Sequence, residues 1–250
     1  MNYRLDIQYD GTRYNGWQRQ KNTEQTIQGK IEAVLSKMTN MPVEIQGAGR
    51  TDAGVHALGQ VASVRLDTTH SPDEIRAYLN RYLPEDIGIT AVRPVPERFH
   101  ARLNAVGKHY DYRIATDPSL HILERKYMYP FTEPLNLTSM KAAAAYLTGT
   151  HDFQCFCARK IKKSTVRQLD SITFTELPGE LCISYLGEGF LYNMVRILTG
   201  TLLEIGIGKR SKDSIPVLFA SGVRENAGFT APAQGLVLRE VFYDSVSKYI

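Results

Sequence analysis

Apolar side chains in the first hundred residues recur at strand spacing and then at helix spacing. Over residues 3–9 every second position is apolar, which predicts a half-buried strand, and residues 27–38 follow helical periodicity. Ser71 and Pro72 are typical of a helix N-cap and first helical position. The predicted order is β-α-β-β-α-β, the ferredoxin-like arrangement. Its strands lie at 3–9, 43–46, 60–66 and 87–95, and its helices at 27–38 and 72–83.

The second half of the chain predicts a similar run of elements. Aromatic and apolar residues alternate over 110–114, and residues 137–147 form an alanine-rich helical stretch. Pro178 and Gly179 mark a turn between two strands. The order is β-α-β-β-α-α-β. The remaining elements are strands at 169–174, 181–185 and 236–243 and helices at 190–205 and 211–219.

Two halves of one topology predict an internal duplication. We expect an α+β fold of two similar ferredoxin-like or RRM-like α/β halves with mainly antiparallel sheets. The boundary lies near residue 105, with halves 1–105 and 106–250. Four-stranded sheets of this kind often bind RNA, but a fold alone does not determine function.

Positive charge is concentrated in three stretches, although the net charge of the 250-residue chain is only +4. The basic segment, residues 158–167, contains five Lys or Arg residues and no acidic residue. Residues 98–113 and the loop containing Arg13, Arg19 and Lys21 are also basic and include aromatic side chains. Cations mixed with aromatic rings suit phosphate contact and base stacking. Solvated surface loops are the alternative interpretation.

The sequence does not indicate a redox, metal or nucleotide-binding site, a secretion signal or a membrane span. The three cysteines, Cys155, Cys157 and Cys182, fit neither a CxxC redox motif nor a paired zinc site, and we expect them to be reduced. The N-terminus has no apolar signal core, and no stretch suits a membrane span. We therefore expect a cytoplasmic protein without membrane contact. No nucleotide-binding glycine motif is complete, and Asp52 and His56 have no third metal ligand at a recognisable spacing, so neither cofactor nor metal is expected.

The strongest chemical candidate is the glycine-rich stretch GAGRTDAGVHA at residues 47–57. Arg50 and Asp52 are two residues apart, and an adjacent cation keeps a carboxylate ionised, as a nucleophile requires. A loop held by one ion pair is the structural alternative. Arg196 lies in an apolar helical stretch. If its guanidinium is buried, it requires an anion as a partner, whereas a guanidinium that faces solvent requires none. Tyr110 and Tyr112 lie on the same face of a predicted strand. Either both rings pack in the core, or one of them stacks on a nucleotide base.

At this point the motifs resemble those of the bacterial tRNA pseudouridine synthase A family along essentially the whole chain. The matching stretches are YDGTRYNGWQRQ, GRTDAGVHA, RFHARLNAVGKHYDYRI, LTGTHDFQCF, GEGFLYNMVRILTGTLLEIGIG and AGFTAPAQGLVL. The resemblance implies an isomerase that converts uridines 38, 39 and 40 in the tRNA anticodon arm to pseudouridine. It also implies two similar α/β halves with an active-site cleft between them, and a homodimer that binds tRNA.

The resemblance implies a role for each candidate residue. Asp52 matches the nucleophilic aspartate of the family, and Arg50 and Arg196 match basic residues lining the same pocket. Tyr110, the first tyrosine of HYDYR, matches the ring that lies against the target uracil. The reaction involves no redox step or external energy. Covalent attack by Asp52 at C1′ or C6 and a glycal route both remain open.

Three alternatives stand beside this interpretation. The chain is a superfamily relative that modifies other uridines, a non-catalytic RNA-binding module, or a metal-dependent nuclease. The intact Asp52 stretch, with Arg196 and Tyr110, argues against the binding module.

Overall fold

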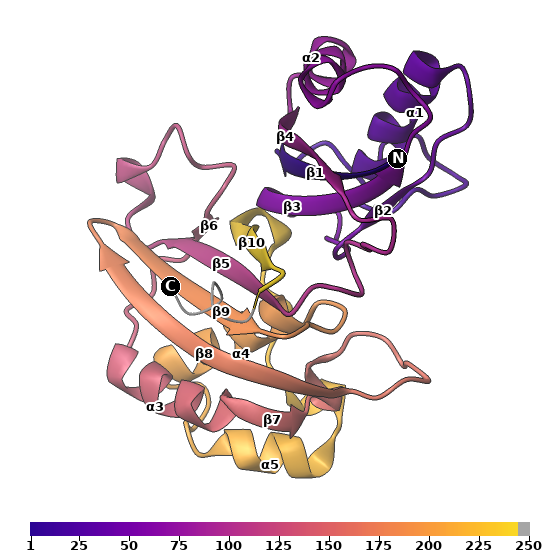
Figure 1. The fold of residues 1–250 in the computed structure, drawn as a ribbon. Coiled ribbons are helices and arrows are strands. Elements are labelled where there is room, and N and C mark those ends of the chain that lie inside the picture. The colour runs from indigo at the N-terminus through magenta and orange to yellow at the C-terminus, as the bar shows by residue number, and fades with distance from the viewer. Residues whose placement is uncertain (245–250) are drawn as a thin grey trace. The chain divides into compact units, whose positions relative to one another are not determined.

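A computed structural model describes residues 1–244, which divide into two compact units. Unit 1 comprises Met1–Val106 together with the C-terminal segment that begins at Val237, and unit 2 comprises Gly107–Leu236. The predicted second half extends to Ile250, and residues 245–250 lie outside the described part of the chain. Each unit combines helices with a mainly antiparallel sheet, which confirms the expected α+β class (Figure 1).

The sheet of unit 1 is organised around β3. β1 pairs antiparallel with β3 and β4, so that Leu5 lies opposite Ala62 on one side and Val92 on the other. β2 pairs antiparallel with β3 at residues 62–64, and β10 runs parallel to the beginning of β3. The strands are β1 (Asn2–Tyr9), β2 (Ile45–Gly47), β3 (His56–Arg65), β4 (Ile87–Val95) and β10 (Leu236–Phe242).

Two helices, α1 (Ile27–Thr39) and α2 (Pro72–Tyr82), cover one face of this sheet (Figure 1). The hydroxyl of Thr26 caps α1 by accepting from the Gly29 amide. Ser71 and Glu74 form a reciprocal capping box on α2, which satisfies two amides at the helix start. The predicted order of elements in the first half is therefore confirmed.

The sheet of unit 2 has the order β5-β9-β8-β7, and every neighbouring pair in it is antiparallel. The predicted turn between β8 and β9 lies at Pro178 and Gly179, and the glycine has φ +68°, which favours a residue without Cβ. The strands are β5 (Gly107–Ala115), β6 (Tyr129–Pro130), β7 (Gly149–Asp152), β8 (Val166–Leu177) and β9 (Glu180–Gly187).

The helices of unit 2 pack together on one face of this sheet (Figure 1). α4 is buried along almost all of its length, and Thr199 on it shares a 2.8 Å hydrogen bond with the hydroxyl of Tyr185 on β9. The helices are α3 (Leu137–Leu147), α4 (Met194–Gly206) and α5 (Ser214–Ser221). The 3₁₀ turns are η1 (Pro118–Leu120), η2 (Gln154–Phe156), η3 (Arg224–Asn226) and η4 (Ala233–Gly235).

Several elements differ from the sequence expectation. The short strands β6 and β7 were not predicted, and β7 supplies the fourth strand of the unit 2 sheet. α4 begins at Met194 rather than residue 190, because Asn193 adopts a left-handed conformation (φ 60°) that interrupts the apolar run before it. The last strand, β10, follows the second half in sequence, but Val237 pairs with His56 in unit 1. Over residues 1–244, none of the helices is both long and apolar enough to cross a membrane.

Candidate active-site residues

Asp52 lies in the loop between β2 and β3, at a tight turn. Its side chain is half-buried, and its carbonyl accepts a 3.2 Å hydrogen bond from the Val55 amide. Gly54 within the turn has φ +79°, a conformation that favours glycine. The turn leaves the Asp52 carboxylate partly accessible while its backbone is constrained.

The connection between β1 and α1 packs against this turn. The Trp17 amide donates to the Thr51 carbonyl at 3.1 Å, and the Gly54 amide donates to the Tyr14 carbonyl at 3.3 Å. Gly16 has φ +90°, and a Cβ on it would lie 2.6 Å from the Thr51 carbonyl oxygen. Only glycine therefore permits this approach to the residue that precedes Asp52.

A buried hydroxyl pair also holds that residue. The hydroxyls of Tyr9 and Thr51 lie 2.8 Å apart, although the residues are 42 positions apart in sequence. Burial raises the pKa of Tyr9, so its hydroxyl stays neutral as a hydrogen-bonding group. β1 thus fixes the backbone immediately before Asp52.

Arg50 and His56 flank Asp52 in different surroundings. The Arg50 side chain is exposed, and within residues 1–244 it forms no ion pair, so the ion pair weighed from the sequence is not a feature of this loop. His56 is buried where β3 begins, and its Nδ1 accepts from the Gly11 amide at 3.0 Å and lies 3.2 Å from an Asp10 carboxylate oxygen. His56 therefore supports the β1–α1 connection.

In unit 2, Tyr110 and Tyr112 occupy the same face of β5. Tyr112 is fully buried and donates to the Pro232 carbonyl at 2.7 Å, so it belongs to the core. Burial raises the pKa of Tyr112. Tyr110 is 7% exposed, and its ring meets that of Phe190 edge-on at 5.1 Å.

Arg196 lies in the first turn of α4 and is half-buried. Its Nε donates to the Ala231 carbonyl at 2.7 Å, and Nη1 donates to Asn193 Oδ1 at 3.3 Å. The Ala231 amide in turn donates to the Arg196 carbonyl at 3.1 Å. The guanidinium plane is therefore oriented by the loop that precedes β10.

The four predicted site residues fall into two pairs. Arg50 and Asp52 share one loop of unit 1, and Tyr110 and Arg196 belong to unit 2. Within unit 2, the β9–α4 connection, residues 188–193, contacts both, because it carries Phe190 and Asn193.

Sequence reasoning missed the residues that hold these side chains in place. Tyr9, Gly16 and Thr51 support the Asp52 turn, and Ala231 orients Arg196. All except Thr51 lie well away in sequence from the residue they support. The glycine of YNGW at position 16 was the available signal, because an isolated glycine between aromatic residues suggests close backbone approach.

Comparison with known proteins identifies many relatives. A family profile described as tRNA pseudouridine synthase matches residues 7–104 and 143–244. A protein named tRNA pseudouridine synthase A from Bacillus sp. (strain KSM-64) is 48% identical over 243 residues, 97% of this chain and 99% of its own length. The corresponding protein from Acetivibrio thermocellus is 44% identical over 97% of this chain and 99% of its own length.

Among solved structures, a chain from a crystal structure of a Cbf5–Nop10–Gar1 complex resembles this one with a TM-score of 0.39 and 11% identity. The match covers 80% of this chain and 45% of that chain. A likeness this distant supports no conclusion about the site.

Proposed function

Since the chain belongs to the tRNA pseudouridine synthase family, we propose that it isomerises uridines 38, 39 and 40 of the tRNA anticodon arm, with Asp52 as the catalytic carboxylate. The family and its relatives establish an isomerase that forms pseudouridine in tRNA. The three tRNA positions and the roles of individual residues belong to the proposal.

The observation that carries the proposal is the constrained, accessible carboxylate at position 52. A nucleophile or base must be held still while remaining open to substrate. The Asp52 side chain is half-buried, and the residue before it is held by the Tyr9 hydroxyl and by the Trp17 amide. This arrangement suits attack on a nucleotide that enters from solvent.

The reaction breaks the N1–C1′ bond of uridine, turns the uracil, and joins C5 to C1′. The proton at C5 is lost, and N1 gains one, so atoms and electrons balance without an oxidant or reductant. Asp52 attacks C1′ or C6 covalently, or acts as the base that begins elimination to a glycal. The uridine must first leave its stack, which costs a few kcal/mol and is offset by other contacts with the RNA.

The other three residues have supporting roles in this proposal. Tyr110 contacts the detached uracil and helps to remove the C5 proton. Arg196, whose plane is oriented by the Ala231 carbonyl, presents a fixed guanidinium to an anion, and the exposed Arg50 contacts the RNA backbone.

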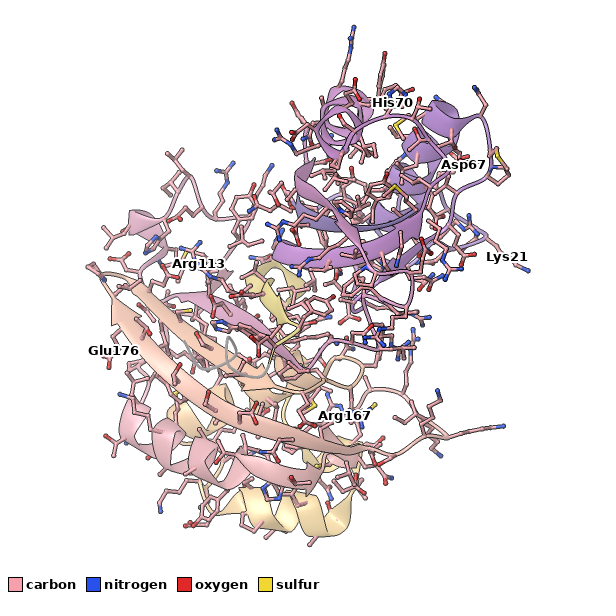
Figure 2. The ribbon with its side chains drawn as sticks, viewed as in Figure 1. Lys21, Asp67, His70, Arg113, Arg167 and Glu176 are labelled. Atoms are coloured by element: carbon pink, nitrogen blue, oxygen red, sulfur yellow. The ribbon has the colours of Figure 1, made fainter. Side chains whose placement is uncertain are left out.

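Replacing Asp52 tests the central claim. We expect Asp52→Asn to abolish tritium release from C5-labelled tRNA while tRNA binding is retained, because the substitution removes the nucleophile and little bulk. Asp67→Asn is the matched control, since Asp67 is an exposed carboxylate of the same unit (Figure 2). Continued tritium release in the Asp52 variant would remove Asp52 from the mechanism.

Mapping pseudouridines tests the positions. In tRNA from a strain that lacks this protein, uridines 38, 39 and 40 should remain unmodified. Loss of pseudouridine at other positions would instead indicate a member of the superfamily that modifies other uridines.

We also propose a homodimer that acts in the cytoplasm, where its tRNA substrate is found. A solution mass twice that of the 28.1 kDa chain is the expected result. A mass equal to one chain at working concentration would contradict the dimer.

A further inference from the structure

The β9–α4 connection makes three side-chain contacts within unit 2 over four of its residues. Phe190 packs on Tyr110, and Asn193 accepts from Arg196. Between them, Tyr192 lies under the guanidinium of Arg159, whose Cζ is 3.8 Å from the ring centroid. The first two contacts belong to the site described above, and the third is not explained by it.

The Arg159–Tyr192 stack is firmly anchored and exposed. The Ala158 amide donates to the Tyr192 carbonyl at 3.2 Å, and the thiol of Cys157 donates to the Arg159 carbonyl at 3.1 Å. Arg159 is exposed, and the Tyr192 side chain is 38% exposed. A planar guanidinium on an aromatic ring therefore faces solvent next to the connection that carries Phe190.

Unneutralised cations continue from this stack along the basic segment. Lys160, Lys162 and Lys163 are exposed, and they form no ion pair within residues 1–244. The basic segment ends at Arg167 near the start of β8 (Figure 2), where Nη1 donates to two backbone carbonyls, of Ser164 and Val166. These contacts hold one nitrogen of the guanidinium and fix its plane.

A hollow of about 440 Å³ adjoins the same region. It lies between the β7–β8 edge and the first residues of the β9–α4 connection. Its lining residues are Thr150, Val166, Arg167, Gln168, Glu188 and Gly189. The hollow therefore has room for a sugar and phosphate next to Arg167, the cation at the end of the basic segment.

We propose that the Arg159–Tyr192 stack is a platform on which the base of a second tRNA nucleotide stacks, one other than the target uridine. Splayed bases stack on aromatic rings and on guanidinium planes, and neighbouring lysines contact the phosphates. Because stacking uses the π face that every base has, the platform takes any base. This inference rests on the proposed function and adds a second nucleotide site to it.

The position of the stack fits a nucleotide close to the target. Tyr192 is two residues from Phe190, which touches the proposed uracil-contacting ring of Tyr110. A nucleotide held there anchors the RNA strand beside the flipped uridine, and its stacking energy offsets part of the unstacking cost.

The salt dependence of binding separates stacking from phosphate contact. Stacking is non-ionic, so Tyr192→Leu should raise the Kd for unmodified tRNA about tenfold at every salt concentration. The slope of log Kd against log salt should not change. Tyr192→Phe should restore the affinity. Tyr146→Leu, which changes an exposed tyrosine on α3, is the matched control and should bind as the wild type does.

A second pair of variants tests the guanidinium plane. Arg159→Lys keeps the charge but loses the plane, so it should weaken binding and leave the slope unchanged, whereas Arg159→Ala should also reduce the slope. Equal binding by Arg159→Lys and the wild type would show that only its charge matters.

Two results with the Tyr192→Leu variant would also overturn the platform. If the Kd of Tyr192→Leu is unchanged, no base stacks at this position. If the slope of log Kd against log salt falls in this variant, Tyr192 acts by positioning the neighbouring lysines rather than by stacking. Unfolding midpoints of all variants identify any loss of fold, and Tyr192→Phe serves as the shape-conserving comparison. Pseudouridine formation by the wild type is measured in parallel, because its absence would contradict the proposed function rather than the platform alone.

Discussion

Tyr110 and Tyr112 have the same residue type and strand face but different surroundings. The hydroxyl of Tyr112 donates a hydrogen bond to the Pro232 carbonyl. Pro232 lies in the same loop as Ala231, whose carbonyl orients Arg196. The ring of Tyr110 lies against Phe190 in the β9–α4 connection. Their substitutions should therefore affect different properties of the protein.

Tyr112→Phe should destabilise the fold by about 1 kcal/mol, because it leaves the Pro232 carbonyl without its donor. Tyr110→Phe should instead reduce pseudouridine formation, with a smaller change in the free energy of unfolding. Urea unfolding and tritium release on both variants check the pair. A Tyr110 variant that loses stability as severely as activity would assign this ring to the core.

At this scale the sequence singled out Asp52, the proposed reactive residue, but not the residues that support it. The GRTDAGVHA stretch is local, so its position between two strands could be predicted. The Tyr9–Thr51 hydroxyl pair depends on the register of β1 against β3, which residue patterns do not specify. The core position of Tyr112 likewise became visible only from its contacts, because residue patterns alone do not distinguish it from Tyr110.

Among the elements, the long connection between β5 and α3 is held by one charged cluster. Arg113 on β5 makes a bidentate pair with Glu180 on β9, at 2.6 and 2.9 Å, and contacts Glu124 at 3.2 Å. His121 faces the Glu124 carboxylate at 3.1 Å and the Pro178 carbonyl at 3.2 Å. Because both ring nitrogens of His121 face acceptors, the protonated imidazolium fits this position best.

This geometry makes the stability of the β5–α3 connection sensitive to pH. The Glu124 carboxylate raises the pKa of His121 above its ordinary value. A raised folded-state pKa stabilises the protein below the unfolded value of about 6.5, and this contribution disappears as pH rises through the folded pKa. The melting temperature of the wild type should exceed that of His121→Asn at pH 5.5, and the difference should shrink by pH 8.5. A difference independent of pH would exclude this titration.

Elements with local signals were predicted well, and those set by distant partners were not. Ser71, Pro72 and Glu74 mark the start of α2 through a capping box that involves only neighbouring residues. The start of α4 was placed four residues early, because the apolar run before Asn193 continues helical spacing although the backbone turns. The parallel pairing of β10 with β3 joins segments far apart in sequence, and no local pattern encodes it.

On the scale of the whole molecule, charge placement matters more than the net charge of +4. Many cations are paired, as Arg113 is with Glu180, whereas the three lysines of the basic segment have no carboxylate partner within residues 1–244. A tRNA is therefore expected to meet an uneven surface on which this segment is a main ionic contact.

Replacing Lys160, Lys162 and Lys163 together with Gln should flatten the salt dependence of tRNA binding. Each lost phosphate contact lowers the slope by about 0.7 to 0.9, so a decrease of about 2 is expected if all three contribute. The control replaces Lys126, Lys141 and Lys212, exposed lysines of the same unit, with the same change in net charge. An equal decrease in both triple variants would mean that only net charge matters.

The parallel strand β10 has a consequence for synthesis on the ribosome. Unit 1 is interrupted at Val106 and resumes at Val237, after all of unit 2 has been translated. At ordinary elongation rates that delay is about 10 s, during which the edge of β3 next to the Asp52 loop lacks its final neighbour. An open strand edge invites association with other chains. A nascent polypeptide stalled within unit 2 would thus carry the proposed catalytic residue, Asp52, beside an unfinished sheet, a state for chaperones to protect.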